Sequence, residues 1–393
     1  MTVPTRLFVG KLNRATTDES LRAHFPGSTD AGVMRGTEGK SKQHGFVVFA
    51  TEAQAEAAMV TLNDSLLDDR NISVKLAVPP KPPAPKGTGK KASAAFPFHK
   101  TINALVDIGA NLTSKSLLPH LSQTLAHSAT ANVTNIIITG TSLKSTREAL
   151  KLCREHHKQS PHSVALYATA GIHPHEATHQ MEQSGGDITV WVKQLESLIQ
   201  ANLDVVRAVG ECGLDYDRKF STHADQIVVF EQQLALAEKF SMPVFLHNRD
   251  AHDDFLKSLK KYPTVKGVVH CYTDPDPTHV TAYLELGFTI GITGWVCDER
   301  RGVEVAEKIV PLIPLDRLMI ETDAPYLMPR NITGGKKPKC NEPALLGWVC
   351  KKVAECYHVD EEVIARATTE NARKLFGLPV DDNPVDQNAA TAS

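Results

Sequence analysis

The sequence is poor in cysteine and contains no Cys-x-x-Cys pair. Its seven cysteines are an odd number and lie far apart, at positions 153, 212, 271, 297, 340, 350 and 356. A disulfide framework uses an even set of cysteines, and a zinc ribbon uses closely spaced pairs. The pattern therefore excludes both kinds of domain and predicts reduced thiols.

Long apolar runs are also missing. No stretch approaches the roughly 18 uninterrupted apolar residues that a membrane-spanning helix needs. The first residues, MTVPTR, lack the basic start and the long apolar core of a signal peptide. We therefore expect a soluble protein of the cytoplasm, the nucleus or both, without membrane association, and we expect it to be a monomer.

A strong net charge is the third missing feature, since the formal charge is −2. Residues 101–393 carry 29 basic and 36 acidic side chains, whereas residues 79–100 carry five basic and no acidic ones. A protein that coats nucleic acid through a general positive charge is thereby excluded. Any nucleic acid must be held by local sites or through bound cations.

What is present is the composition of an ordinary folded protein, with 41% apolar and 22% charged residues in a chain of 393. One hydrophobic core usually stops growing near about 250 to 300 residues, so two folded units are predicted. The segment VPPKPPAPKGTGKK, which starts at Val78, is rich in prolines that prevent helix formation. We predict a linker over 79–100 between domains at 5–78 and 101–378, followed by a disordered tail at 379–393.

The first domain is predicted to follow the order βαββαβ. Apolar runs at 7–9, 45–49 and 72–76 alternate with helical stretches at 18–25 and 52–62, and a weak strand is expected at 31–35. The runs LFVGKL, from Leu7, and KQHGFVVF, from Lys42, resemble the two ribonucleoprotein signatures of the RNA-recognition motif. The resemblance implies a small α+β, ferredoxin-like domain whose sheet carries aromatic side chains that stack bases.

The residues of this domain predict its fold more firmly than they predict binding of nucleic acid. Phe8 and Phe46 match the stacking positions of the family, but His44 stands where an aromatic residue is usual and Gln43 where glycine is usual. The domain also has no net charge. Binding of RNA or single-stranded DNA and a role in protein interaction therefore stay equally open.

The second domain contains eight short apolar runs separated by longer helical stretches. The runs lie at 105–109, 136–140, 166–171, 205–210, 243–246, 267–269, 288–292 and 318–320. Strands that alternate with helices in this way are typical of parallel sheets with crossover helices. Eight such units predict an α/β fold, a (β/α)8 TIM barrel.

Polar side chains follow five of these runs. The third is followed by His173 and His175, the fourth by Glu211, the fifth by His247, the sixth by His270 and the eighth by Glu321 and Asp323. In a TIM barrel the carboxyl ends of the strands converge on one face. Carboxylates that meet there repel each other unless a cation lies between them, and imidazoles with carboxylates suit a hydrolytic divalent metal.

Residues 102–378 resemble the TatD family of metal-dependent deoxyribonucleases. The matching motifs are DIGANLT from Asp107, AGIHPH from Ala170, GECGLDY from Gly210, HNRDA from His247, HCYT from His270, GITGWVCDERRG from Gly291, ETDAPYL from Glu321 and NEP from Asn341. Many relatives carry a His-x-His pair after the first strand, whereas this chain has Gly109-Ala110-Asn111. A second ion, if one binds, is therefore expected to be held loosely or only with substrate.

The resemblance implies that Glu211, His247, His270 and Asp323 bind one or two divalent ions, with Mg²⁺ expected and Mn²⁺ or Zn²⁺ as alternatives. Bound metal lowers the pKa of its water and polarises a phosphoryl oxygen. Glu211 and Asp323 are thus predicted to be catalytic, and either Glu321 or Glu342 to orient or deprotonate water.

Further candidates bind the substrate. His173, His175 and Arg249 are predicted to contact phosphate. Trp295 could stack a base, but a tryptophan that only packs at the barrel rim would account for this residue equally well.

The expected function is a metal-dependent deoxyribonuclease, by resemblance a 3'-to-5' exonuclease on single-stranded or frayed DNA, in DNA repair or DNA fragmentation. The same metal pocket can activate water against a carbonyl, so an amidohydrolase or esterase, such as a D-aminoacyl-tRNA deacylase, stays open. A further alternative is a nuclease that the first domain directs to RNA, with RNA or a protein as the partner of that domain.

Overall fold

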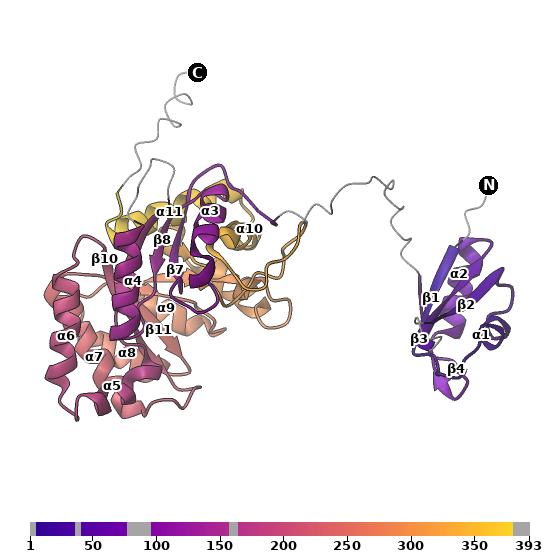
Figure 1. Ribbon diagram of the computed structural model, residues 1–393, viewed down its shortest axis with the longest axis horizontal. Coiled ribbons are helices and arrows are strands. Elements are labelled where there is room, and N and C mark those ends of the chain that lie inside the picture. Colours follow the sequence, from indigo (N-terminus) through magenta and orange to yellow (C-terminus); the bar gives the residue numbers. More distant parts are fainter. Residues whose placement is uncertain (1–4, 36–40, 77–95, 157–163, 380–393) are drawn as a thin grey trace, which may run out of the picture. The chain divides into compact units, whose positions relative to one another are not determined.

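The chain divides into two compact units, unit 1 at Met1–Ala92 and unit 2 at Ser93–Ser393. The structure, a computed structural model, describes residues 5–35, 41–76, 96–156 and 164–379 (Figure 1). Most of the predicted linker, 79–95, and the tail from residue 380 lie outside the described residues. The division between the units falls within the predicted linker, and the predicted domain bounds stay predictions.

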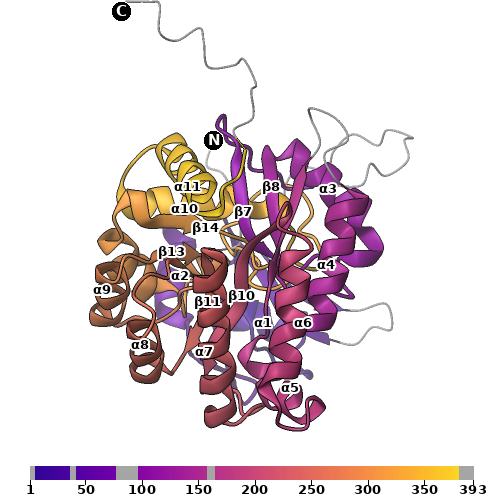
Figure 2. The same ribbon diagram turned by 90° about the vertical axis from the view of Figure 1, so that its left-hand side faces the viewer.

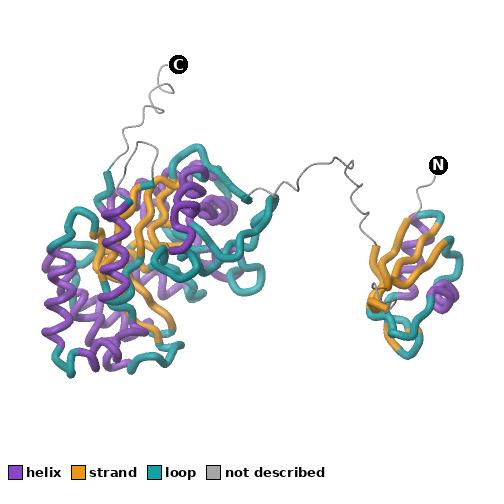
Figure 3. The backbone as a smooth tube through the Cα atoms, viewed as in Figure 1, coloured by secondary structure: helices purple, strands orange, loops and turns teal. Residues whose placement is uncertain are grey.

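Unit 1 has the predicted element order, with one addition. Its elements are β1 (Thr5–Gly10), α1 (Asp18–His24), β2 (Asp30–Arg35), β3 (Ser41–Phe49), α2 (Glu52–Leu62), β4 (Leu66–Leu67), β5 (Arg70–Asn71) and β6 (Ser73–Leu76). The antiparallel sheet has the order β2-β3-β1-β6, and β4 pairs with β5 in a short hairpin that was not predicted. Figure 3 shows this unit's strands in orange and its helices in purple.

Alternation of side chains along the strands builds the core of unit 1. Leu7 and Val9 of β1 and Val47 of β3 are buried, whereas the residues between them are partly exposed. Successive side chains of a strand point to opposite faces, so one face packs on the helices and the other faces outward. Leu21 and Phe25 complete this core from the α1 side.

Unit 2 contains all eight predicted strands in one parallel sheet of order β14-β13-β12-β11-β10-β9-β8-β7. They are β7 (Leu105–Ala110), β8 (Val133–Ile138), β9 (Ala165–Ala170), β10 (Val206–Asp215), β11 (Val244–Arg249), β12 (Gly267–Val269), β13 (Thr289–Ile292) and β14 (Leu318–Ile320). The sheet's two edges meet at a bridge between Ala110 and Ala324. This contact brings the start and the end of the sheet together as a barrel.

Helices surround the strands, as Figure 2 shows. They are α3 (Leu121–Thr130), α4 (Leu143–Glu155), α5 (Ala177–Gln183), α6 (Ile188–Gln200), α7 (His223–Phe240), α8 (His252–Lys260), α9 (Pro277–Glu285), α10 (Leu346–Tyr357) and α11 (Glu361–Phe376). After β13, short turns and a π-helix at Val305–Ile309 take the place of a crossover α-helix. No helix among the described residues is both long and apolar enough to span a bilayer.

The barrel is closed by apolar side chains at the end opposite the polar residues. Val106, Phe245 and Met319 pack with Phe376, the last residue of α11, and with Leu378, which comes just after that helix. The strands β7 and β9 are buried along their whole length, as expected of strands covered on both faces. The polar side chains of the opposite end are therefore held on a rigid apolar base.

The last part of the predicted linker belongs to unit 2. The indole N–H of Trp348 donates to the carbonyl of Pro97 (2.8 Å), and His99 pairs with Glu361. Phe96 and Phe98 contact the ring of His127 on α3. Residues 96–99 of the predicted linker thus pack against the barrel, because the rings at 96 and 98 contact a surface on it.

Candidate metal centre and nucleic-acid interface

The sequence suggested that Glu211 follows a strand, but the structure places it inside one. The strand β10 continues beyond Gly210 to Asp215, and its pairing with β11 shifts between Gly210 and Cys212. Such a β-bulge redirects a side chain and is common next to active sites. The strand passes close to β11 at Gly213, whose φ is 141° and where a Cβ would lie 1.9 Å from the carbonyl oxygen of His247.

Three imidazoles converge on one oxygen of Glu211. Its Oε1 lies 2.8 Å from Nε2 of His270, 3.1 Å from Nδ1 of His247 and 3.1 Å from Nε2 of His173. Burial works to raise the pKa of Glu211, but His173, His270 and the hydrogen bonds hold it well below its usual value. The carboxylate is therefore charged at the centre of the site.

Glu321 orients His270 from behind. It is fully buried, and its Oε2 lies 3.4 Å from Nδ1 of His270 while its Oε1 accepts the backbone N–H of Cys271 (2.6 Å). A proton on Nδ1 leaves the lone pair of Nε2 directed at the site. A carboxylate that holds the second nitrogen of a histidine in this way is typical of metal-binding histidines.

Asp323 lines the same cavity as Glu211 and both imidazole ligands predicted from the sequence. Its Oδ1 accepts a hydrogen bond from the amide of Asn111 (3.0 Å), and its φ of 51° is unusual for aspartate. Burial, together with the nearby Glu211 and Glu321, raises the pKa of Asp323 to about 8, against the influence of His270. Burial and the two neighbouring carboxylates thus outweigh the attraction of the His270 imidazole.

The spacing of His247 and of His270 from Glu211 suits a divalent cation. The two nitrogen-to-oxygen separations between His247 or His270 and Glu211 match the roughly 3 Å between neighbouring ligands of an ion with bonds near 2.1 Å. An added positive charge would also compensate the carboxyl of Asp323. The four residues predicted as ligands thus line one cavity, and their role as ligands stays a prediction.

His173 has a different role, although His173, Glu211 and His247 offer ligand atoms within 4.8 Å of one another. Its Nδ1 accepts the backbone N–H of His175 (3.1 Å), so the proton of the neutral ring lies on Nε2. Burial lowers the pKa of His173 to about 4, which keeps the ring neutral. An Nε2–H group is a donor to a carboxylate or a phosphate and not a metal ligand.

Asp215 is a site residue to which the sequence assigned no role. It is buried at the end of β10, and its Oδ2 contacts Nε2 of His175 (2.7 Å) and Nε2 of His247 (3.2 Å). Burial opposes its ionisation, but the hydrogen bonds from His175 and His247 lower its pKa. One carboxylate thus orients both a predicted ligand and a predicted phosphate contact. Its only signal in the sequence was its place in the motif that begins at Gly210.

Three arginines, Arg218, Arg249 and Arg301, line the same cavity, which has a volume of about 670 Å³. Arg249 pairs with Asp217 and lies 3.9 Å from Asp215, so its guanidinium is held near the carboxylate that contacts His175 and His247. With His173 and His175, these side chains supply donors for a phosphate group.

Glu342 does not belong to this site. Its Oε2 lies 2.9 Å from Nδ1 of His127 on α3, and it does not line the cavity. Glu321 does not line the cavity either, and it contacts His270 and a backbone amide. Its position suits orientation of His270 and not direct contact with water, so the predicted role in activating water stays a prediction for both glutamates.

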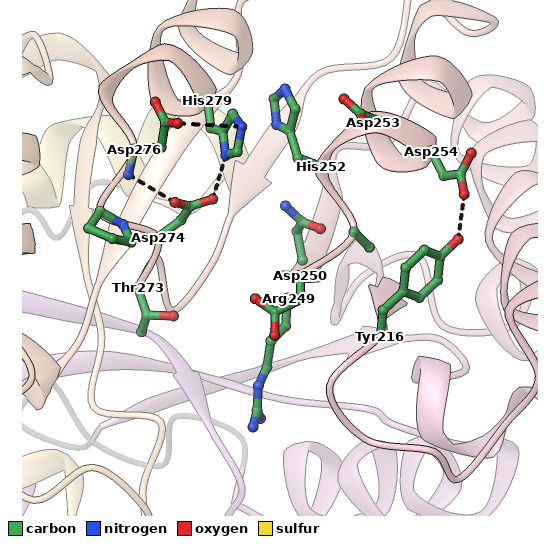
Figure 4. A pocket seen from close by; sticks show the side chains of 13 residues that line it. Tyr216, Arg249, Asp250, His252, Asp253, Asp254, Thr273, Asp274, Asp276 and His279 are labelled. Atoms are coloured by element: carbon green, nitrogen blue, oxygen red, sulfur yellow. Dashed lines mark hydrogen bonds and ion pairs between the residues drawn. The ribbon is translucent and has the colours of Figure 1, made fainter.

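A second cavity of about 820 Å³ adjoins the first and shares Asn248, Arg249 and Thr273 with it. Five aspartates line it, at positions 250, 253, 254, 274 and 276. Figure 4 shows that the guanidinium of Arg249 points away from Asp274 and Asp276. This acidic surface disfavours the phosphate backbone of a nucleic acid.

Trp295 lines the first cavity but is partly covered. The guanidinium of Arg301 lies 4.6 Å from the centre of its ring, and Asp298 holds that guanidinium at 2.9 Å. One face of the indole is therefore occupied by a cation. The predicted stacking role of Trp295 stays a prediction.

The predicted binding face of unit 1 also assembles. The ring of Phe8 lies 5.4 Å from that of His44 and 5.6 Å from that of Phe46, all on the outward face of the sheet. Arg6 lies 3.7 Å over the ring of Phe46. The guanidinium thus covers one face of the Phe46 ring, and stacking of bases on Phe8, His44 and Phe46 stays a prediction.

Comparison with known proteins identifies both units. Residues 106–377 match the family of TatD related DNases, and residues 7–73 match the RNA recognition motif. Over 278 residues the chain is 44% identical to a "3'-5' ssDNA/RNA exonuclease TatD" of Rahnella, covering 70% of this chain and 98% of the relative. A relative of the same name from Pantoea ananatis is 41% identical over 278 residues, covering 70% of this chain and all of the relative.

Solved structures agree with this assignment. A TatD homologue from Escherichia coli K12 shares 26% identity at a TM-score of 0.60, over 70% of this chain and 98% of that one. A TatD family hydrolase from Entamoeba histolytica has a TM-score of 0.62 at 24% identity, over 70% of this chain and 98% of that one, which shows the shared fold.

Proposed function

Since this chain belongs to the family of TatD related DNases, we propose that unit 2 hydrolyses phosphodiester bonds of single-stranded DNA, one nucleotide at a time from the 3' end. The convergence of His173, His247 and His270 on one oxygen of Glu211, beside Asp323, carries this proposal. The printed names of the relatives support the exonuclease activity and its polarity.

The metal-binding residues in this proposal are Glu211, His247, His270 and Asp323. A divalent ion, by our proposal Mg²⁺, supplies a water of lowered pKa and stabilises charge on the phosphoryl oxygens. Asp215 and Glu321 hold the two imidazoles so that one nitrogen of each faces the site. Because these contacts exist before substrate binds, little rearrangement is needed at the moment of reaction.

The phosphate contacts come from His173, His175 and Arg249. Neutral His173 carries its proton on Nε2, and His175 donates toward Asp215 in the absence of substrate. Both imidazoles and the Arg249 guanidinium line the cavity, so a phosphate placed there meets donors on several sides. These donors hold the scissile group while the acidic surface beyond Arg249 repels a continuing backbone.

Unit 1 is proposed to hold the single strand through Phe8, His44 and Phe46. Its sheet face carries these three rings and the guanidinium of Arg6. Stacking on aromatic rings tolerates any base, which suits an enzyme that moves along a strand.

The function is tested by incubating the purified chain with single-stranded DNA labelled at either end, with Mg²⁺ or with a chelator. A 5' label should give a ladder of shortening products, and a 3' label should release a labelled mononucleotide at once. Glu211→Gln should abolish both the ladder and the release of the mononucleotide, while circular dichroism should show that the variant is fully folded. Release of a labelled mononucleotide from the 5' end, or turnover of an aminoacyl ester with intact DNA, would contradict the proposal.

A further inference from the structure

Two aromatic side chains are strongly exposed, and both lie at the mouth of the catalytic cavity. Among the phenylalanine, tyrosine and tryptophan residues that the structure describes, only Phe220 (67%) and Tyr326 (60%) are mostly exposed. Tyr326 lines the cavity itself. The ring of Phe220 lies 4.9 Å from that of His175, which also lines the cavity. Large rings are usually covered by protein, so their meeting at one cavity indicates a binding surface.

The backbone beside each ring is tied to the metal-binding end of the barrel. The N–H of Tyr326 donates to the carbonyl of Asp323 (3.0 Å), and its own carbonyl accepts from Asn341 (2.7 Å). On the other side, Arg218 N–H donates to Asp215 (2.9 Å) and Ser221 donates to the carbonyl of His175 (3.0 Å). The rings are exposed, whereas the segments that carry them are fixed.

The charges around the cavity favour a nucleic-acid strand that passes across these two rings. The neighbouring cavity carries five aspartates beyond Asn248 and Thr273, so a charged strand is disfavoured on that side. Arg218 lines the catalytic cavity two residues before Phe220, where it can meet a phosphate. Trp295, in contrast, has one ring face under Arg301.

We propose that Phe220 and Tyr326 are base-stacking residues that hold the terminal nucleotides of a single strand with its phosphates toward His175 and Arg218. The inference rests on the proposed nuclease function and names the part of the substrate that the rings recognise. A base stacks only when it is unpaired, so the two rings select single-stranded or frayed ends over duplex.

The test uses the full chain and an oligonucleotide with 2-aminopurine as its 3'-terminal base. Stacking quenches the fluorescence of this base, and hydrolysis then releases the terminal nucleotide and restores its fluorescence, so the two events are read separately. Phe220→Ala and Tyr326→Ala should each raise the KM for single-stranded DNA about tenfold with little change in kcat, and the double variant should lose the quenching. Phe220→Trp and Tyr326→Phe keep a ring and should behave as the unchanged chain.

An abasic 3' end provides the second comparison. The unchanged chain should bind it about tenfold more weakly than the normal strand, and the alanine variants should lose no further affinity. Val190→Ala, an exposed apolar position on α6, is the matched control. Unchanged KM and quenching in the double variant overturn the inference. Quenching without hydrolysis would instead contradict the nuclease function and leave the stacking role supported.

Discussion

At the residue scale, the site depends on which nitrogen of each imidazole faces which carboxylate. His270 faces Glu211 with Nε2 and Glu321 with Nδ1, and His247 lies between Glu211 and Asp215. The buried carboxylates behind the ligands thus determine where the lone pairs point. Loss of such a partner weakens metal binding without removing a ligand.

Glu321→Gln is therefore expected to raise the Mg²⁺ concentration for half-maximal activity by about 10- to 100-fold, with most activity restored at saturating metal. Metal titrations of nuclease activity measure this shift. Glu342→Gln is the matched control, since Glu342 also contacts a histidine but lies outside the cavity. An equal shift in both variants would contradict the assignment of Glu321.

Asp107 gives a pH dependence of stability. Burial raises its pKa to about 7, against the hydrogen bonds from Thr322, while an unfolded aspartate titrates near 3.9. The folded state thus binds the proton more tightly, so the contribution of this group to stability falls as pH rises from about 4 to about 7.

Asp107→Asn should remove this part of the pH dependence. Without metal, the free energy of unfolding of the unchanged chain is expected to fall relative to the variant by up to about 4 kcal/mol across that range. Urea unfolding with chelator at pH 4.5 and pH 8 measures it. A constant difference between the two proteins at both pH values would show that Asp107 titrates normally.

At the element scale, β10 places two acidic side chains of the site through one irregular strand. Its bulge at Gly210 and Cys212 redirects Glu211, and its extension to Asp215 supplies the carboxylate behind His247. Gly213 permits this course because the strand passes against the carbonyl of His247. A side chain at this position would separate β10 from β11.

Gly213→Ala is accordingly expected to lower stability by at least about 3 kcal/mol and to reduce activity strongly even where the protein is folded. Thermal unfolding and nuclease assays below the unfolding temperature measure both effects. Gly185→Ala is the control: its φ is also positive, at 61°, but no atom lies within 4 Å of the added Cβ. It should cost only about 1 kcal/mol and leave activity intact. Similar losses in both variants would speak against a special role for the close approach at Gly213.

At the scale of the whole molecule, the two units have separate cores, and by our proposal unit 2 hydrolyses the strand while unit 1 binds it. The boundary has a physical cause, because Phe96, Phe98 and His99 cover part of the barrel through contacts with His127 and Trp348. A chain that begins after these residues would expose the apolar surface that they cover.

Removal of residues 1–92 should leave hydrolysis of short strands nearly unchanged and weaken binding of long single strands. Removal of residues 1–100 should in addition cost about 3 kcal/mol of stability, because the two partly buried phenylalanines are lost. Chemical unfolding and KM values for short and long strands measure the two effects. Equal stability of the two truncated chains would contradict the boundary at residue 93. Loss of hydrolysis on removal of residues 1–92 would contradict the proposal that unit 2 alone carries the hydrolytic activity.

The sequence by itself determined the architecture, since apolar runs at helix-length spacing predict barrel strands, and it indicated that polar residues after those strands would meet at one end. The ligand set Glu211, His247, His270 and Asp323 came from the resemblance to the TatD family and stays a prediction. Only the tertiary structure assigned a role to Asp215, removed Glu342 from the site and set Phe220 and Tyr326 at its mouth. These outcomes depend on distances between side chains far apart in the chain and on which rings other segments cover, and neither is encoded in the spacing of residues along the sequence.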